Sequence, residues 1–115
     1  MPTYIAFTYT ADVDWTDPQY GEEMKEYAEF GEAAQAVIRG GHSLYPTATA
    51  TTVRTPAGKG GDPVATDGPY AETKEALTGY YVLECADLDE AVAVAGRLPA
   101  AWNGAVEIRP VIEFA

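Results

Sequence analysis

The chain has 115 residues and a formal net charge of −11, from 18 acidic and 7 basic residues. This length fits one domain, residues 1–115, which can bury roughly two thirds of its unfolded surface without disulfides or metals. The acidic balance argues against nucleic acid as a partner, because phosphate contacts need clustered Lys and Arg. A single cysteine, Cys85, cannot form an internal disulfide.

The sequence also argues against membrane association and secretion. No apolar run approaches the roughly 18–20 residues that a membrane span needs. The first residues lack the basic and apolar regions of a signal peptide, so we expect a cytoplasmic protein. Eight acids and one base, Lys25, precede residue 33. They form either a solvated helix face or a docking surface for a basic partner.

In chain order, the first predicted elements are a strand and a long helix. Alternation of apolar and polar residues predicts a strand over residues 4–9. After a polar loop, apolar residues spaced by three and four predict a helix over residues 18–39. Gly40 and Gly41 are expected to end this helix, because glycine adopts the C-cap geometry freely.

A group of short elements follows. Residues 42–45 predict a short strand, and the alternating segment 47–54 predicts a clearer one. Residues 55–63 are rich in glycine and proline and predict a hairpin loop, with a short return strand over 63–66. Asp67 begins a turn, and residues 70–77 are expected to form one or two helical turns.

The last third predicts a strand, a helix and a strand. Residues 80–85 carry apolar side chains on both faces, which is typical of a central strand. Asp87 and Glu90 form a capping-box pattern that begins a helix over residues 88–98. The final strand covers residues 105–112, and Pro110 within it predicts an edge, a bulge or the strand end.

This order predicts an α+β fold: a ferredoxin-like antiparallel sheet with two long helices on one face. Such a domain leaves its second sheet face uncovered, and another copy of the chain is the simplest partner for that face. We therefore expect a homodimer. Five aromatic residues either supply the interface or lie in the core of the single chain: Tyr4, Tyr45, Tyr80, Tyr81 and Trp102.

The segment 67–75, Asp-Gly-Pro-Tyr-Ala-Glu-Thr-Lys-Glu, is the most distinctive part of the sequence. Local chemistry explains it as a turn in which the Asp67 carboxylate accepts backbone N–H groups. Glu72 would then be an acid of the first helical turn, and Lys74 a solvated base. Alternatively, Asp67 is a catalytic residue, and Tyr70, Glu72 and Lys74 bind a ligand.

This segment, together with residues 77–84, resembles the signature of the DGPF branch of the YCII-related family. Residues 46–54, 87–91 and 106–111 are similar to the same family. Tyr70 stands where phenylalanine is usual. The resemblance implies a dimeric α+β barrel, in which two ferredoxin-like sheets pack face to face.

For function, the resemblance implies little that is specific. Some relatives occur beside or fused to extracytoplasmic-function sigma factors. Others have been proposed as enzymes that use a histidine–aspartate pair, and one is linked to dehydrochlorination of an aromatic compound. In those proteins the histidine lies in the first helix, whereas the only histidine here is His42, beyond the predicted helix 18–39. The pair therefore does not carry over, although Asp67 could replace its acidic member.

His42 is either a surface residue or a general acid or base that is oriented by Asp67. Arg54 and Arg109 end strands, and they either clamp an anionic ligand or pair with the many acids. One histidine and one cysteine are too few for a metal site of soft ligands, and nothing in the sequence predicts a cofactor.

Two functions remain open at this point. The first is a dimeric module that binds an unidentified small molecule or protein partner, with a regulatory role as in the relatives beside sigma factors. The second is an enzyme that acts on a small molecule, such as an aromatic compound, by proton abstraction or elimination. In the enzyme, Asp67 or His42 would be the base, Tyr70 would contact the substrate and Arg54 would hold an anionic group.

Overall fold

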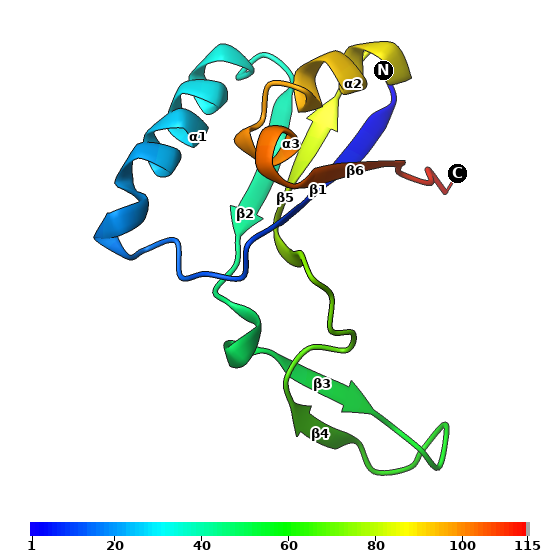
Figure 1. Cartoon of the computed structure of the whole chain (residues 1–115). Coiled ribbons are helices and arrows are strands. Elements are labelled where there is room, and N and C mark those ends of the chain that lie inside the picture. The colour runs from blue at the N-terminus through cyan, green and yellow to red at the C-terminus, as the bar shows by residue number, and fades with distance from the viewer. Residues whose placement is uncertain (115) are drawn as a thin grey trace.

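The computed structural model describes residues 1–114. A four-stranded antiparallel sheet carries the helices on one face, and a separate two-stranded hairpin projects from it (Figure 1). In spatial order the sheet consists of β2 (Ile38–Ser43), β5 (Ala76–Glu84), β1 (Thr3–Thr10) and β6 (Ala105–Pro110). The helices are α1 (Gly21–Ala33), α2 (Leu88–Ala95) and the short α3 (Pro99–Asn103). This is the predicted ferredoxin-like α+β arrangement.

The core lies between the sheet and the helices. Along β1 every second residue is buried, which places Tyr4 and Ala6 on the helix side. Phe30 of α1 and Val94 of α2 pack onto them together with Leu83 of β5. Cys85 is also fully buried there.

The predicted start of α2 is confirmed in atomic detail. The Asp87 carboxylate accepts a hydrogen bond from the Glu90 N–H at 2.9 Å, and the Glu90 carboxylate accepts one from the Ala86 N–H. The first bond satisfies a donor that the first helical turn leaves free, and the second ties Ala86, the residue before the cap, to that turn. Likewise, Pro110 ends β6, which is an edge strand where a missing N–H does not interrupt a ladder.

The predicted helix over residues 18–39 is wrong after Ala33. A 3₁₀ turn at Pro18–Tyr20 leads into α1, which ends at Ala33. Ile38 is already part of strand β2, where it pairs with Leu83 of β5. Ile38 packs against the core as a strand residue, so its side chain continues the apolar stripe of the helix without being helical. Gly41 lies inside β2 and does not end a helix.

The predicted helical turns over residues 70–77 are also wrong. Ala76 and Leu77 belong to β5, where they pair with Thr10 and Tyr9 of β1. Because these two residues pair in the sheet, they cannot be part of a helix. Residues 70–75 form an irregular loop that connects the hairpin to the sheet. The predicted strand 47–54 is shorter, because a 3₁₀ turn at Thr47–Thr49 precedes β3 (Thr51–Arg54). Helix α3 was not predicted.

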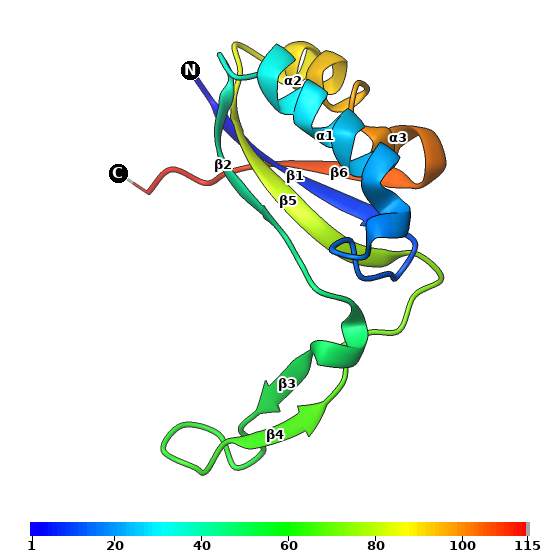
Figure 2. The ribbon, with the colours of Figure 1, turned by 90° about the vertical axis from the view of Figure 1, so that its left-hand side faces the viewer.

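The second face of the sheet carries no helix, and we call it the open face (Figure 2). Cross-strand pairs place Ile5 beside Val82, Phe7 beside Tyr80, and Tyr9 beside Leu77 on this face. Of the aromatic residues predicted for an interface, only Tyr80 lies on the open face itself. Tyr4 and Tyr81 belong to the core, and the Trp102 indole donates to the Gly96 carbonyl.

The hairpin of β3 and β4 (Val64–Asp67) extends away from the body as an arm (Figures 1 and 2). The radius of gyration is 16.3 Å, whereas a compact domain of this length has about 13 Å. All of β4 is exposed, and so are Val53 and Val64 on the two strands. The arm therefore lacks a core of its own within one chain.

One irregularity in the pairing of β1 with β5 matters for the site. Thr8 pairs with Gly79 and Tyr9 with Leu77, so Thr78 is an extra residue on β5. This β-bulge buries the Thr78 hydroxyl on the helix side, where it contacts the Thr8 and Thr10 hydroxyls at 3.1 and 3.0 Å. In the described part of the chain, no helix has the length and apolar character required to cross a membrane.

Candidate functional site

The signature segment begins at the base of the arm, where β4 ends at Asp67. Gly68 follows with a φ of 108°, a conformation that glycine adopts without steric cost. Its N–H donates to the Ala50 carbonyl at 2.8 Å, and its own carbonyl accepts the Thr52 hydroxyl at 2.8 Å. These two bonds fix the start of the signature loop (residues 68–75) against β3.

Asp67 itself has a modest role in the single chain. It pairs with Thr51 in the hairpin ladder, and its side chain is exposed. Within residues 1–114 its carboxylate accepts no hydrogen bond and forms no ion pair. The local interpretation, in which this carboxylate caps a turn around residues 70–72, therefore does not hold here.

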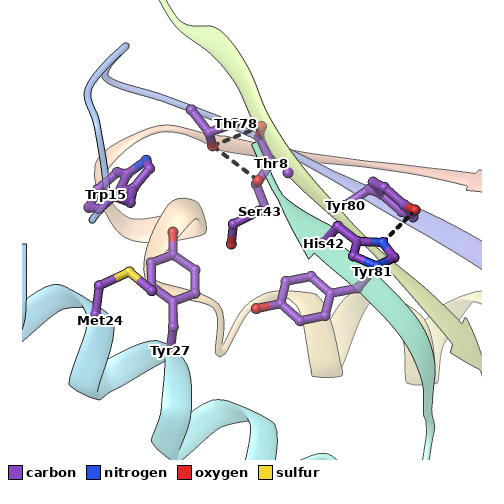
Figure 3. Close-up of a pocket in the computed structure, with 10 residues that line it drawn as sticks. Thr8, Trp15, Met24, Tyr27, His42, Ser43, Thr78, Tyr80 and Tyr81 are labelled. Carbon is purple, nitrogen blue, oxygen red and sulfur yellow. Dashed lines mark hydrogen bonds between the residues drawn. The ribbon is translucent and has the colours of Figure 1, made fainter. Parts of the chain in front are cut away.

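His42 and Asp67 lie in different sheets. His42 is on β2 and pairs across the ladder with Tyr80 of β5, whereas Asp67 is on the arm. The His42 Nδ1 lies 2.9 Å from the Tyr80 hydroxyl, which gives the imidazole a hydrogen-bond partner on the open face (Figure 3). Tyr80, and not Asp67, is thus the group that orients His42 within one chain.

Arg54 and Tyr70, two of the predicted ligand-binding residues, contact each other. The Arg54 guanidinium carbon lies 5.1 Å from the centroid of the Tyr70 ring, which is a cation–π distance. This contact joins β3 to the signature loop. In the part of the chain that the structure describes, neither Arg54 nor Arg109 forms an ion pair; the one ion pair there is Arg39–Glu84, at 3.5 Å.

The signature loop borders a cavity of about 660 Å³ between the base of the arm and the sheet. This volume lies within the roughly 300–1,000 Å³ of small-molecule sites. From the loop, Pro69, Tyr70, Ala71, Glu72 and Thr73 line the cavity. Of the predicted site residues, Tyr70 and Glu72 are therefore at the cavity, whereas Asp67, His42, Arg54, Lys74 and Arg109 are not among its lining residues.

The rest of the lining comes from the sheet and from the segment that enters the arm. Tyr9 and Leu77, a cross-strand pair of the open face, form one wall, and Leu44, Tyr45 and Ala50 form another. The surface of the lining is mostly apolar, with polar groups at a few points. Because Tyr9 and Leu77 belong to both, the cavity is continuous with the open face.

Asp12, a second acid of the cavity wall, belongs to no distinctive motif of the sequence. Its carboxylate accepts hydrogen bonds from the Thr47 N–H, at 2.8 Å, and from the Thr47 hydroxyl. These bonds favour the charged form, so the Thr47 hydroxyl and N–H hold the pKa of Asp12 below its ordinary value. The two residues are 35 positions apart in the sequence, so no local sequence pattern predicts their contact.

Charge in the cavity has one sign. Asp12 and Glu72 line it, and no Lys or Arg does so among the described residues. Arg109 lies further along the open face, beside Ile5 on β1. On the same face the Tyr9 hydroxyl donates to the Glu107 carboxylate at 3.4 Å, and burial, followed by the charge of Glu107, raises the pKa of Tyr9.

A second, much smaller cavity of about 20 Å³ lies between α1 and the sheet (Figure 3). Tyr27 of α1 and Thr78 of the bulge are among its lining residues. Its volume suits a single water molecule. Burial raises the pKa of Tyr27 to about 12. The His42 ring points away from Tyr27, toward Tyr80, so this cavity does not bring an acid–base pair together (Figure 3).

The fold and the cavity together define a small ferredoxin-like α+β domain with a ligand-sized site at the base of a projecting arm. The chain matches the YCII-related domain over residues 4–115 and belongs to that family. It is similar to an uncharacterized protein of Rhizobium meliloti (strain 1021), with 39% identity over 90 residues. That match covers 76% of this chain and 66%, slightly less than two thirds, of the relative.

Proposed function

We propose that this protein is a homodimeric module that binds a small, amphipathic organic molecule in the cavity beside the signature loop. The observation that carries the proposal is the cavity of about 660 Å³, whose wall is formed in part by the loop that is the most distinctive segment of this sequence. A mostly apolar lining with a few fixed polar groups is typical of small-molecule sites. The Asp12–Thr47 pair and the Glu72 carboxylate supply such groups.

The open face supports the homodimer. Ile5, Phe7 and Val82 are all only partly buried on a face that no helix covers, and these apolar side chains favour contact with another surface. Val53 and Val64 of the arm are exposed apolar side chains as well, and contact with another surface would also bury them. A second copy placed on the open face would cover these residues and border the cavity at Tyr9 and Leu77. Face-to-face packing of two such sheets is also what the family resemblance implies.

An enzyme is the alternative function. The cavity offers the carboxylates of Asp12 and Glu72 as acid–base groups. However, the Asp12 carboxylate is engaged by Thr47, and hydrogen bonds that favour its charged form make it a weaker base. His42 bonds to Tyr80 away from the cavity. The geometry therefore favours binding over turnover, and a regulatory role like that of the relatives beside sigma factors belongs to this proposal.

A screen of small aromatic and aliphatic compounds by amide NMR tests the binding function. Ala71 is exposed and lines the cavity, so Ala71→Trp should fill the site without disturbing the core. Ala48 is exposed on the neighbouring 3₁₀ turn and is not among the lining residues, so Ala48→Trp is the matched control. A bound compound should shift the signals of residues 70–73 and Leu77, and Ala71→Trp alone should abolish the shifts. Compounds that bind both variants equally would place binding elsewhere and overturn the proposal.

A further inference from the structure

The cavity contains an unusual set of aromatic rings. Tyr9, Tyr45 and Tyr70 come from β1, from the segment entering the arm and from the signature loop, and all three line the same space. Tyr45 and Tyr70 are 64% and 77% exposed, so packing of the core does not explain their position. Tyrosine rings present a negative π face, and several rings around one space are the arrangement that binds organic cations.

The formal charges of the cavity agree with that arrangement. Asp12 and Glu72 contribute two carboxylates to the wall, and no Lys or Arg of residues 1–114 lines it. Thr47 occupies one acceptor position on each oxygen of Asp12, and each carboxylate oxygen has a second lone pair for a ligand. Glu72 is exposed and has no hydrogen-bond partner among the described residues, so its carboxylate is free for a ligand.

The structure already shows a cation on one of these rings. The Arg54 guanidinium lies 5.1 Å from the centroid of Tyr70, although Arg54 does not itself line the cavity. Arg54 is also the group that could instead favour an anion near the loop. Two carboxylates lie within the lining and one guanidinium lies outside it, so the formal charge around the cavity is still negative.

We infer that the ligand of this cavity is a small organic cation, an amine or quaternary ammonium group on an apolar or aromatic body. The cationic group would contact the rings of Tyr45 and Tyr70 and the carboxylates of Asp12 and Glu72, and the body would lie against Leu44 and Leu77. This inference rests on the proposed binding function and specifies its ligand class.

Three probes that share a phenyl ring and differ in charge test the inference: benzyltrimethylammonium, benzyl alcohol and benzoate. Each is titrated into the full chain while the amide signals of residues 70–73 and Leu77 are followed by NMR. We expect the cation to bind at least about tenfold more tightly than the other two. Its affinity should fall as salt is raised.

Two substitutions locate the cation. Glu72→Gln removes a charge from the wall and should weaken benzyltrimethylammonium about two- to fivefold, the range of a partly exposed ion pair. Glu29→Gln, an equal charge change on the exposed face of α1, is the control and should have no effect. Tyr45→Leu should weaken the cation by roughly 2- to 30-fold, and Tyr45→Phe should retain its binding, because the ring is kept.

Each outcome is decisive. If benzyl alcohol or benzoate binds at these residues as tightly as the cation, the ligand class is overturned while the proposed binding function stands. If Glu29→Gln weakens the cation as much as Glu72→Gln does, the effect is one of net charge and the inference fails. If none of the probes shifts these signals, the inference also fails, and the binding function is then decided by the wider screen with Ala71→Trp.

Discussion

The Arg54 guanidinium lies over the Tyr70 ring, 5.1 Å from its centroid, and thereby ties the arm to the signature loop. We predict that Tyr70→Leu loosens the arm, because the cation–π contact is lost, whereas Tyr70→Phe keeps the ring and leaves the arm unchanged. An exposed contact of this kind contributes about 0.5–1 kcal/mol, equivalent to a roughly two- to fivefold change in an opening equilibrium. Amide hydrogen exchange in β3 and β4 measures it. Equal exchange in the Leu and Phe variants would show that the contact does not hold the arm.

The hydrogen bonds from Thr47 to Asp12 predict a pH effect at the cavity wall. They lower the pKa of Asp12 below its ordinary value of 3.8, so the stabilisation is fully present above about pH 4. It is lost as the pH falls through the lowered pKa of the folded chain. In Thr47→Ala the hydroxyl is gone, and the pKa of Asp12 should rise toward its ordinary value.

An NMR titration of the side-chain carboxyl groups measures this change. Asp14, whose pKa is lowered by the Thr16 hydroxyl, is an internal control and should titrate as before in Thr47→Ala. A shift of both groups would indicate a general change in structure and would contradict the local explanation.

The open face predicts the oligomeric state. Phe7 is partly buried and paired with Tyr80, so Phe7→Asp would place a charge at the centre of the proposed dimer interface. We expect dissociation to become about 100-fold more favourable, since burying an aromatic side chain contributes about 2–3 kcal/mol. Val92 of α2 is 54% exposed on the helix side, and Val92→Asp should leave the dimer intact. Sedimentation velocity distinguishes the two variants; a wild-type chain that is monomeric at high concentration would refute the dimer.

Gly41 is predicted to tolerate no side chain. Its φ is 151°, and a Cβ there would lie 2.5 Å from the Tyr80 carbonyl oxygen in the backbone of β5. Gly41→Ala should therefore lower the free energy of unfolding by about 1–3 kcal/mol. At Gly40 an added Cβ would meet only the Val82 side chain at 3.7 Å, so Gly40→Ala should cost much less. Urea denaturation compares the pair, and equal losses would exclude the close approach as the cause.

Tyr27 predicts a loss of stability at high pH. Burial raises its pKa from 10.0 to about 12. Above about pH 10 the unfolded chain therefore loses this proton while the folded chain keeps it, so stability falls as the pH rises toward 12. Tyr27→Phe should flatten that part of the stability profile. Denaturation midpoints between pH 9 and pH 11.5 (roughly the span of this window) measure the effect, and an unchanged slope would show that Tyr27 ionises normally.

Much of the fold followed from local patterns in the sequence. Alternation located β1, and the capping residues Asp87 and Glu90 located the start of α2, because both signals are complete within a few residues. The apolar spacing predicted a helix that extends too far, to Ile38. An apolar residue at this position fits the buried stripe of a helix and also a strand that packs against the same core. The local pattern also failed at Ala76, where pairing with Thr10 overrides the local turn chemistry.

The candidate site was less predictable, because tertiary contacts build it. Tyr70 and Glu72 came from the distinctive segment, and both line the cavity. Asp12 and Tyr9 lie far from that segment in sequence, and only the sheet and the segment entering the arm bring them to it. The proposed partnership of His42 with Asp67 depended on a similar long-range contact, and in the single chain Tyr80 takes that place.

The bulge at Thr78 keeps β5 in phase with β1 although β5 has one residue more. Side chains alternate between the faces of a strand, but Thr78 and Gly79 are both buried on the helix side, so Leu77 still stands opposite Tyr9 and turns to the cavity. A chain shortened by that one residue would therefore present the same side chains to the ligand, but it would lose the buried hydroxyl that contacts Thr8 and Thr10. Relatives that are one residue shorter at this position are expected to retain the specificity of the cavity, whereas a deletion elsewhere in the strand, which no bulge absorbs, would exchange its faces.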